Sequence, residues 1–288
     1  MQHLEGKVAL VTGAAGKMGQ GRAIACRLAR DGADVAINDF SQFGIHHSED
    51  DRIEDWQGLK SVEEEIKALG RKALIVEADI GSKKQVQEMV TKCIDTFGKI
   101  DILVNNAAAV TDPVLIFDTL EVSDENWERV IGVNIFGTFW CCKAVANHMI
   151  ERGQGGKIIN TASEGVIGAI SSGWGCYLVS KYGVLGITQV LAKELAQYKI
   201  NVNAICPGVT ASEMGGPSST YMRQDMRAGM SWEQAAKKHH ADLLPTIPWG
   251  RTGLPEDMAK VVAFLASGDS DYLTGNVIAV AGGHHMTY

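Results

Sequence analysis

A tyrosine and a lysine, Tyr177 and Lys181, stand four residues apart in the segment Tyr-Leu-Val-Ser-Lys. In a helix, residues at this spacing lie one turn apart on the same face. A phenol has a pKa of about 10 in water, and a cation within about 4–6 Å favours the phenolate and lowers that pKa. The pair could therefore exchange a proton with a substrate near neutral pH. The alternative is a surface tyrosine and lysine on an amphipathic helix, so the rest of the chain must decide.

A glycine-rich segment near the N-terminus suggests a second kind of chemistry. The apolar segment 7–12 predicts a buried parallel strand, and it leads into a loop that contains Gly13, Gly19 and Gly21. A helical pattern follows, and then a second predicted strand that ends in Asp39. Glycines let backbone N–H groups approach a pyrophosphate, a helix N-terminus favours its charge, and the acid meets the ribose hydroxyls. This order predicts a dinucleotide-binding unit.

Strand and helix patterns alternate along the whole chain. The predicted strands cover residues 7–12, 34–39, 73–76, 101–105, 157–161, 201–205 and 276–280. Helices are predicted between them, with a capping box at Ser82 to Gln85, and Gly132 and Gly137 interrupt the helical segment 124–150. The alternation predicts an α/β fold, a Rossmann-like doubly wound parallel sheet of about seven strands with helices on both faces. We expect residues 1–288 to form a single dinucleotide-binding and catalytic domain.

Two segments depart from this alternation. Residues 40–57 are polar and acidic with little periodicity, and we interpret them as a surface insertion. Residues 213–250 collect Met, Trp, Gly and His, and soft apolar side chains suit a lid over a substrate. A plain helical excursion with core-facing methionines is the alternative interpretation.

Composition argues against several kinds of partner. The chain has 27 Lys and Arg against 34 Asp and Glu, a net charge of −7, and no basic run longer than two residues. Nucleic acid is not an expected partner, because binding its phosphates requires a basic surface. The sequence has neither an apolar run near the roughly 18 residues of a membrane span nor a secretory pattern at its start. The six Cys follow no metal or disulfide spacing, so we expect a cytoplasmic protein with free thiols and no membrane partner.

Three histidine doublets, at residues 46–47, 239–240 and 284–285, raise the question of a metal site. Adjacent residues on a helix or strand point in different directions, so a doublet chelates a metal poorly. We therefore expect no catalytic metal.

With these elements in place, the chain resembles the short-chain dehydrogenase/reductase family along nearly its full length. The residues that carry the match are Thr12, Gly13, Gly19, Gly21, Asp39, Asp79, 105–107, Asn134, Ser163, 177–181, Pro207, Gly208, 251–257, Thr274 and Gly275. The resemblance implies an NAD- or NADP-dependent oxidoreductase that acts on a secondary alcohol or its ketone. It also implies a homo-oligomer, either a dimer or a tetramer.

The resemblance assigns roles in the site. It makes Tyr177 the general acid/base, and Lys181 the residue that lowers the pKa of Tyr177 and binds the nicotinamide ribose. Ser163 hydrogen-bonds the substrate oxygen, and Asn134 holds a water that links Lys181 to solvent. The cofactor contacts that it implies come from Gly13, Lys17, Gly19, Gly21, Asp39, Asp79, Ile80, Asn105, Tyr177, Lys181, Pro207 and Ser212.

The glycine loop departs from the family pattern, since five residues rather than three separate Gly13 from Gly19. We place the extra two residues in the phosphate loop, where Lys17 would touch a cofactor phosphate. The alternative alignment puts Lys17 and Gly19 in the last two positions of the motif.

Asp39 favours NAD over NADP as the cofactor. At ~4 Å its carboxylate would repel a 2′-phosphate by about 1–4 kcal/mol. Lys17 and Arg22 could soften that repulsion. One alternative function is a 3-oxoacyl thioester reductase that uses NADPH, against which Asp39 and the acidic net charge argue. Another is a dinucleotide sensor without catalysis, although such relatives typically lack the tyrosine or the lysine.

The substrate itself is not predicted. Trp and Met in the 213–250 segment suggest a bulky apolar alcohol, whereas Glu164, directly after Ser163, suggests a polyol.

Overall fold

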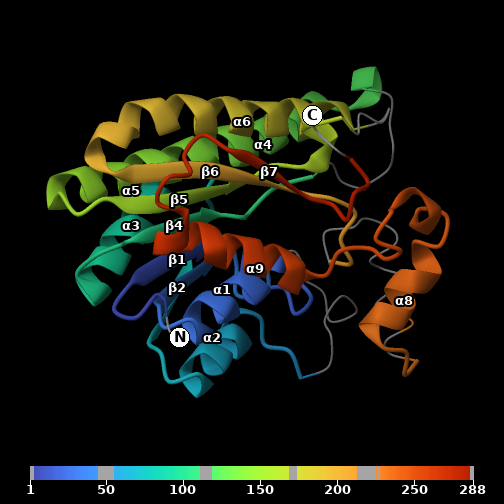
Figure 1. Ribbon diagram of the computed structural model, residues 1–288, viewed down its shortest axis with the longest axis horizontal. Coiled ribbons are helices and arrows are strands. Elements are labelled where there is room, and N and C mark those ends of the chain that lie inside the picture. Colours follow the sequence, from blue (N-terminus) through green and yellow to red (C-terminus); the bar gives the residue numbers. More distant parts are fainter. Residues whose placement is uncertain are drawn as a thin grey trace.

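Seven parallel strands form one sheet in the order β3-β2-β1-β4-β5-β6-β7 (Figure 1). The computed structural model describes residues 3–44, 55–110, 119–168, 174–212, 225 and 228–285. The strands are β1 (Val8–Thr12), β2 (Asp34–Asp39), β3 (Ala73–Glu77), β4 (Ile102–Asn105), β5 (Gly156–Thr161), β6 (Ile200–Pro207) and β7 (Val277–Val280). The predicted fold class is confirmed, and the predicted strands match these bounds to within two residues.

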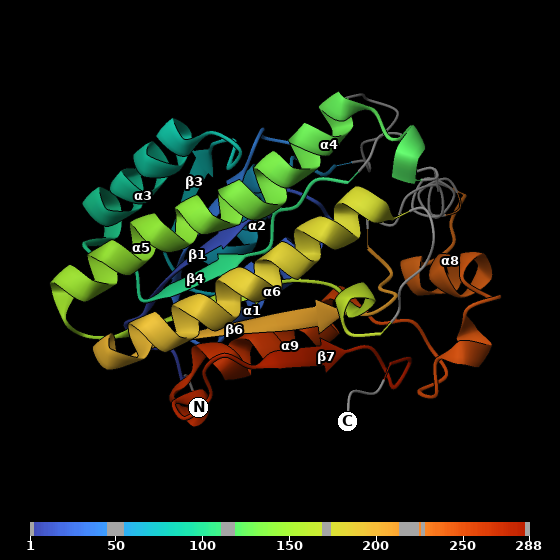
Figure 2. The same cartoon turned by 90° about the horizontal axis from the view of Figure 1, so that it is seen from above.

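Helices cover both faces of the sheet (Figures 1 and 2). They are α1 (Gln20–Arg30), α2 (Leu59–Ala68), α3 (Lys83–Phe97), α4 (Asp124–Ile131), α5 (Thr138–Arg152), α6 (Gly175–Leu195), α8 (Trp232–His239) and α9 (Pro255–Ala266). One apolar core joins α1, α2 and α9 to the sheet, and a second joins α3, α5 and α6 to its other side. Alternate strand residues divide between the cores, since Ala9 and Val11 lie in the first and Leu10 in the second.

The strand order reverses between β1 and β4, from which the chain runs to opposite edges of the sheet. In open α/β sheets, ligands bind outside the carboxyl ends of the strands at such a switch point. The residues after Thr12 and Asn105 are therefore placed where this fold binds a ligand.

The long predicted helix between β4 and β5 contains a π-helical segment, Gly132–Gly137, between α4 and α5. Helical structure therefore continues through the two glycines that were predicted to interrupt it. By length and composition the run Asp124–Arg152 could also cross a membrane, with a hydropathy of 1.2. Its residues Cys141, Val145 and Met149 are instead buried against the sheet, as in the core helix of a soluble fold.

The predicted capping box at the start of α3 is only half formed. The Ser82 hydroxyl accepts from the backbone N–H of Gln85, as in the motif. The Gln85 side chain does not return to Ser82, because its Oε1 accepts from the backbone N–H of Asp79 at 2.9 Å. The predicted bond from Gln85 back to Ser82 is therefore wrong, because the backbone N–H of Asp79 occupies the Gln85 oxygen.

The two irregular segments of the sequence are described in part. Residues 45–54 of the predicted insertion and 213–224 of the predicted lid lie outside the described residues. Trp56, at the end of the insertion, donates its indole N–H to the Ala15 carbonyl at 2.7 Å. Figures 1 and 2 show α8, in the lid region, beyond the carboxyl ends of the strands. Met230 in the same region packs near Met18 of the glycine loop.

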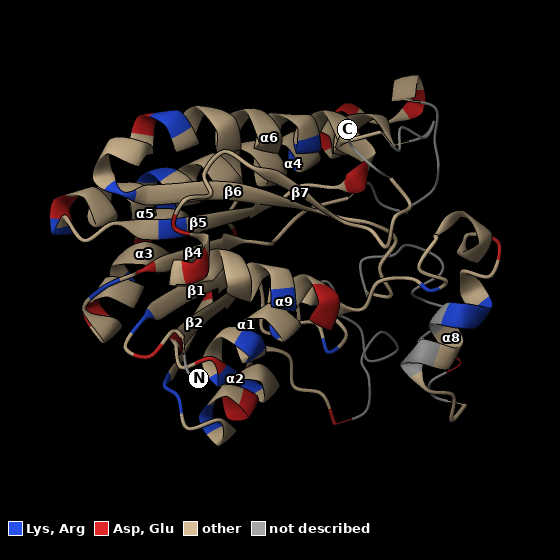
Figure 3. Cartoon of the chain, viewed as in Figure 1, with Lys and Arg blue, Asp and Glu red and all other residues tan. Residues whose placement is uncertain are grey.

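Charged residues are interspersed over the helices. In the view of Figure 3, Lys and Arg and Asp and Glu both occur at scattered positions on the helices. Many of them form ion pairs within or between neighbouring elements, such as Arg27 with Asp31 and Arg71 with Asp34.

Candidate functional site

The glycine loop brings three elements into close contact at the switch point. Gly13 has φ +71°, and a Cβ there would lie 2.7 Å from the Cα of Ala107. A Cβ on Gly21 would lie 2.1 Å from the carbonyl oxygen of Gly13, so no side chain fits there. Helix α1 starts at Gln20 with Gly19 as its N-cap, which puts Gly21 inside the first turn. This is the close approach of strand, loop and helix N-terminus that a pyrophosphate site requires.

Thr12 and Asn106 tie the ends of β1 and β4 together. The Thr12 hydroxyl accepts from the backbone N–H groups of Asn106 and Ala107 at 3.1 and 3.0 Å. The Asn106 side chain donates to the carbonyl oxygens of Thr12 and Gly13 at 2.9 and 3.0 Å. Asn106 was not predicted to have a role of its own, and its only signal in the sequence was its place in the Asn-Asn-Ala segment at the end of β4.

Asp39 ends β2 and lies against the glycine loop. Its Oδ2 accepts from the backbone N–H of Ala15 at 3.0 Å, and its Oδ1 accepts from that of Phe40 at 2.9 Å. The carboxylate therefore lies beside the loop, where the sequence predicts contact with the ribose.

Arg22, the cation that could soften repulsion at Asp39, is held by another acid. Its guanidinium donates two hydrogen bonds to the Glu65 carboxylate, at 2.8 and 2.7 Å, and lies 5.3 Å from the ring centroid of Trp56. Burial would raise the pKa of Glu65, but hydrogen bonds from Arg22 and Cys26 outweigh it and lower that pKa. Glu65 therefore stays ionised and directs Arg22 toward α2.

The other predicted cofactor residues also lie at the carboxyl ends of the strands. Lys17 belongs to the loop after β1, Asp79 and Ile80 follow β3, Asn105 ends β4, and Pro207 ends β6 with Ser212 five residues later. Asn105 has a further role, because its side-chain amide donates to Asn160 on β5 at 2.8 Å. Ser212 is buried, with 8% of its surface exposed. The fold therefore brings these residues, which follow different strands, to the carboxyl end of the sheet.

Tyr177 and Lys181 lie in the first two turns of α6, one turn apart as predicted. The Lys181 ammonium is 5.5 Å from the ring centroid of Tyr177 and donates to the Thr161 carbonyl at 2.8 Å. Ser163, two residues after β5, lies near enough to Tyr177 for its hydroxyl to favour the phenolate. A Cβ on Gly165 would lie 2.4 Å from the Leu178 side chain, so a glycine there permits α6 to approach Ser163.

Burial decides the protonation of this pair. It raises the pKa of Tyr177 to about 12, although the nearby Ser163 hydroxyl opposes the shift. It lowers the pKa of Lys181 to about 8, because the ammonium is removed from water. Desolvation of the phenol therefore sets the direction of the shift, and the role of Lys181 in lowering the pKa of Tyr177 stays a prediction.

Asn134 lies buried in the π-helical segment and bridges two elements. Its Oδ1 accepts from the N–H of Ala109 at 2.7 Å, and its amide donates to the Ala109 carbonyl and the Ser180 hydroxyl, both at 2.9 Å. The Ser180 hydroxyl donates to the Tyr177 carbonyl at 2.6 Å. Asn134 is thus linked to the backbone of the tyrosine, a contact that sequence spacing did not reveal. π-Helical segments often occur at functional sites.

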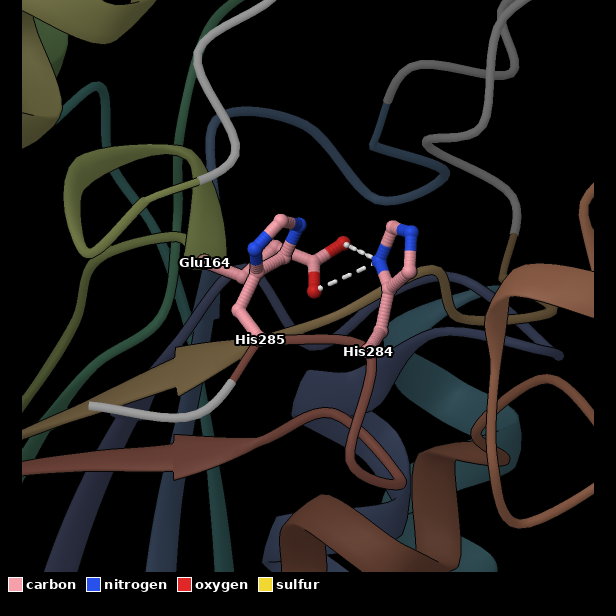
Figure 4. Close-up of side chains that lie close together, drawn as sticks. All are labelled: Glu164, His284 and His285. Atoms are coloured by element: carbon pink, nitrogen blue, oxygen red, sulfur yellow. Dashed lines mark hydrogen bonds and ion pairs between the residues drawn. The ribbon is translucent and has the colours of Figure 1, made fainter. Parts of the chain in front are cut away.

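Glu164, which directly follows Ser163 in the chain, forms a cluster with His284 and His285 (Figure 4). Both oxygens of Glu164 lie close to Nδ1 of His284, at 3.2 and 3.1 Å. The rings of His284 and His285 have centroids 4.4 Å apart. The premise that paired histidines point apart holds for helices and strands, and it does not apply to this doublet, which lies in a turn after β7. Of the other doublets, 46–47 lies outside the described residues, and His239 contacts Asp225 at 2.7 Å.

Comparison with known proteins shows what this arrangement is similar to. The family described as Enoyl-(Acyl carrier protein) reductase matches residues 13–285. The chain is 38% identical over 284 residues to 2-dehydro-3-deoxy-D-gluconate 5-dehydrogenase of Escherichia coli (strain K12), covering 97% of this chain and 96% of the relative. It is 36% identical over 283 residues to the (2S)-[(R)-hydroxy(phenyl)methyl]succinyl-CoA dehydrogenase subunit BbsD of Thauera aromatica, covering 98% of each chain.

Among solved structures, the fold matches a carveol dehydrogenase from Mycobacterium avium in complex with NAD. The TM-score is 0.81 at 28% identity, and the match covers 98% of each chain. The glycine loop, the switch point and the Tyr177 helix of this chain therefore lie within matches that span nearly its whole length.

Proposed function

The chain belongs to the short-chain dehydrogenase/reductase family, and from that premise we propose which of its residues carry the reaction. The family makes it a nicotinamide-dependent oxidoreductase that interconverts alcohols and ketones. We assign Tyr177 as the general acid/base, Ser163 as the residue that hydrogen-bonds the substrate oxygen, and Lys181 as the cation behind them. The observation that carries this assignment is the position of the half-buried Tyr177 beside Ser163 and the buried Lys181.

The nicotinamide, when bound, supplies or accepts the hydride. The protein moves the proton. The Ser163 hydroxyl orients the substrate oxygen toward the phenol, which gives that oxygen its proton in reduction and takes one back in oxidation. With a pKa of about 12, Tyr177 keeps its proton at neutral pH and suits the reductive direction. Lys181, with a pKa of about 8, is largely charged at pH 7.

The glycine loop fits the cofactor, because no side chain could stand at Gly21 without striking Gly13. NAD is the form that we propose. Asp39 ends β2 beside the loop, and Arg22 is already paired with Glu65, which leaves one fewer cation for a 2′-phosphate. The carveol dehydrogenase of similar fold was solved with NAD. Lys17 in the enlarged loop is the proposed phosphate contact.

Acyl thioesters are a second candidate substrate class. The Thauera relative is named for a succinyl-CoA substrate, and the matching family is described as an acyl-carrier-protein reductase. The E. coli relative is named for a sugar acid. A screen of both classes, with other secondary alcohols, therefore covers the two chemistries that the relatives suggest.

We further propose a cytoplasmic homo-oligomer of single-domain subunits, either a tetramer or a dimer. Helices α5 and α6 lie side by side on the outer face in Figure 2. Exposed apolar side chains on this face belong to Phe136, Phe139, Val179, Tyr182 and Val190. Exposed apolar patches often mark protein interfaces, and a second copy of the chain offers the same face. Sedimentation of the purified chain tests this, and a monomer at micromolar concentration would contradict it.

The catalytic assignment is tested with Tyr177→Phe in an assay of NADH formation. We expect kcat to fall by about 10²–10⁴-fold, because the general acid/base is lost, while NAD binding is retained. Tyr198→Phe is the control, since Tyr198 is exposed just beyond the end of the same helix. Undiminished turnover by Tyr177→Phe would contradict the assignment of Tyr177 as the general acid/base. NAD binding without turnover of any alcohol by the wild type would favour a dinucleotide sensor.

A further inference from the structure

We propose that Glu164, His284 and His285 form a binding site for one divalent transition-metal ion of the zinc type. The three side chains come from two distant parts of the chain, the turn after β5 and the turn after β7. In Figure 4 the Glu164 carboxylate points toward the ring of His284, and the two histidines extend from the same C-terminal turn. The proposal does not depend on the redox function.

The distances suit coordination. One ligand atom from each of the three residues lies within 4.8 Å of the other two. Two atoms bonded at about 2.1 Å to a tetrahedral ion are about 3.4 Å apart. The Nδ1 of His284 and the Glu164 oxygens, at 3.1 and 3.2 Å, are already close to that spacing.

The ligand chemistry is that of an open zinc site. Two imidazoles and one carboxylate hold zinc with a fourth position left for water or substrate. Soft and borderline ions prefer imidazole nitrogen, whereas magnesium and calcium prefer oxygen ligands alone. The nitrogen-rich set therefore favours zinc or cobalt over the alkaline-earth ions.

The surroundings hold the carboxylate in place. Glu164 is 8% exposed, and a Cβ on Gly208 would lie 2.9 Å from its Oε2, so the exit of β6 confines it on one side. His284 confines it on another side, with 18% of its side chain exposed. Buried carboxylates are paired with cations or coordinate metals. The alternative is a Glu164–His284 hydrogen bond with no ion, and the two differ in whether zinc binds.

The test uses tag-free, full-length protein that has been treated with a chelator and then dialysed. Titration with zinc chloride, followed by calorimetry, is expected to show one ion per chain with a Kd of micromolar or tighter. Glu164→Gln, His284→Ala and His285→Ala are each expected to weaken binding at least tenfold. His239→Ala is the matched control, because it removes a histidine from another doublet and is expected to leave the affinity unchanged.

Cobalt(II) added to the wild type is a second measurement that needs no variant. Visible absorption bands typical of four-coordinate cobalt are expected, and zinc should abolish them. The proposal is overturned if no ion binds at 100 µM zinc, or if folded variants of the three residues bind zinc as the wild type does. The proposal is also overturned if His239→Ala removes the binding, since the ion would then lie at the other doublet.

Discussion

The ammonium of Lys181 donates a 2.8 Å hydrogen bond to the carbonyl oxygen of Thr161, the last residue of β5. This bond joins the helix that carries Tyr177 to the strand that leads into Ser163. It also holds the ammonium in a buried position, where its pKa falls to about 8. The geometry of the proposed site thus depends on a buried cation that the fold must stabilise.

Lys181→Met is expected to stabilise the protein while it removes activity. Burial lowers the pKa of Lys181 from 10.5 to about 8, and at about 1.4 kcal/mol per pKa unit its charge costs roughly 3 kcal/mol of stability at pH 7. Loss of the hydrogen bond to Thr161 offsets about 1 kcal/mol of the stability gained by removing the charge. We expect the free energy of unfolding at pH 7 to rise by about 1–2 kcal/mol, measured by urea denaturation.

The pH dependence of this difference gives the control. Between pH 8 and 10.5 the unfolded wild type binds the lysine proton and the folded form does not, so the cost to the wild type declines as pH rises. The difference between the two proteins should therefore be largest below pH 8 and smallest near pH 10. A constant difference across that range would contradict a buried, destabilising charge.

The two reaction directions should respond differently to pH. Because burial raises the pKa of Tyr177 to about 12, the phenol that ketone reduction requires is present throughout the neutral range. Oxidation requires the phenolate, so its kcat/KM should rise by up to about tenfold per pH unit while proton transfer limits the rate. Steady-state assays in both directions from pH 6 to 10 measure this. An oxidation profile already level at pH 7 would show a much lower pKa in the working enzyme.

Cofactor preference should depend on Asp39 and on the pairing of Arg22. Asp39→Ser is expected to reduce the ratio of kcat/KM for NAD over NADP at least about fivefold, because repulsion of a 2′-phosphate is worth about 1–4 kcal/mol. Glu65→Gln should shift the ratio in the same direction by releasing Arg22. Glu63→Gln is the matched control, since Glu63 pairs with Lys67 on the same helix. A wild type that prefers NADP would refute the argument.

Asn134→Ala should destabilise the fold through a local loss of hydrogen bonds. The change leaves the N–H and carbonyl of Ala109 without their side-chain partner and removes the contact with Ser180. An unsatisfied buried polar group costs about 1–3 kcal/mol, and we expect a loss of about 2–4 kcal/mol in the free energy of unfolding. Asn126→Ala, whose side chain bonds the Ser123 hydroxyl at the start of α4, is the comparison and should cost less than about 1 kcal/mol. Equal losses in both variants would show that the buried hydrogen bonds of Asn134 contribute no more to stability than those of Asn126.

Local patterns in the sequence determined the architecture. Apolar runs such as 8–12 and 102–105 predict buried parallel strands because burial on both faces demands apolar residues throughout. Gly13 and Gly21 were predictable for a similar reason, since a Cβ at either position would strike backbone. Tyr177 and Lys181 were predictable because helical periodicity puts residues four apart on one face.

The tertiary structure decided how these groups behave. Arg22 meets Glu65, Asn134 meets Ala109, and Glu164 meets His284 across 43, 25 and 120 residues of chain. No local pattern determines such contacts, because they depend on how distant elements pack. The protonation of Tyr177 and Lys181 was settled in the same way, since the cost of removing a charge from water follows the depth of burial rather than the spacing of residues.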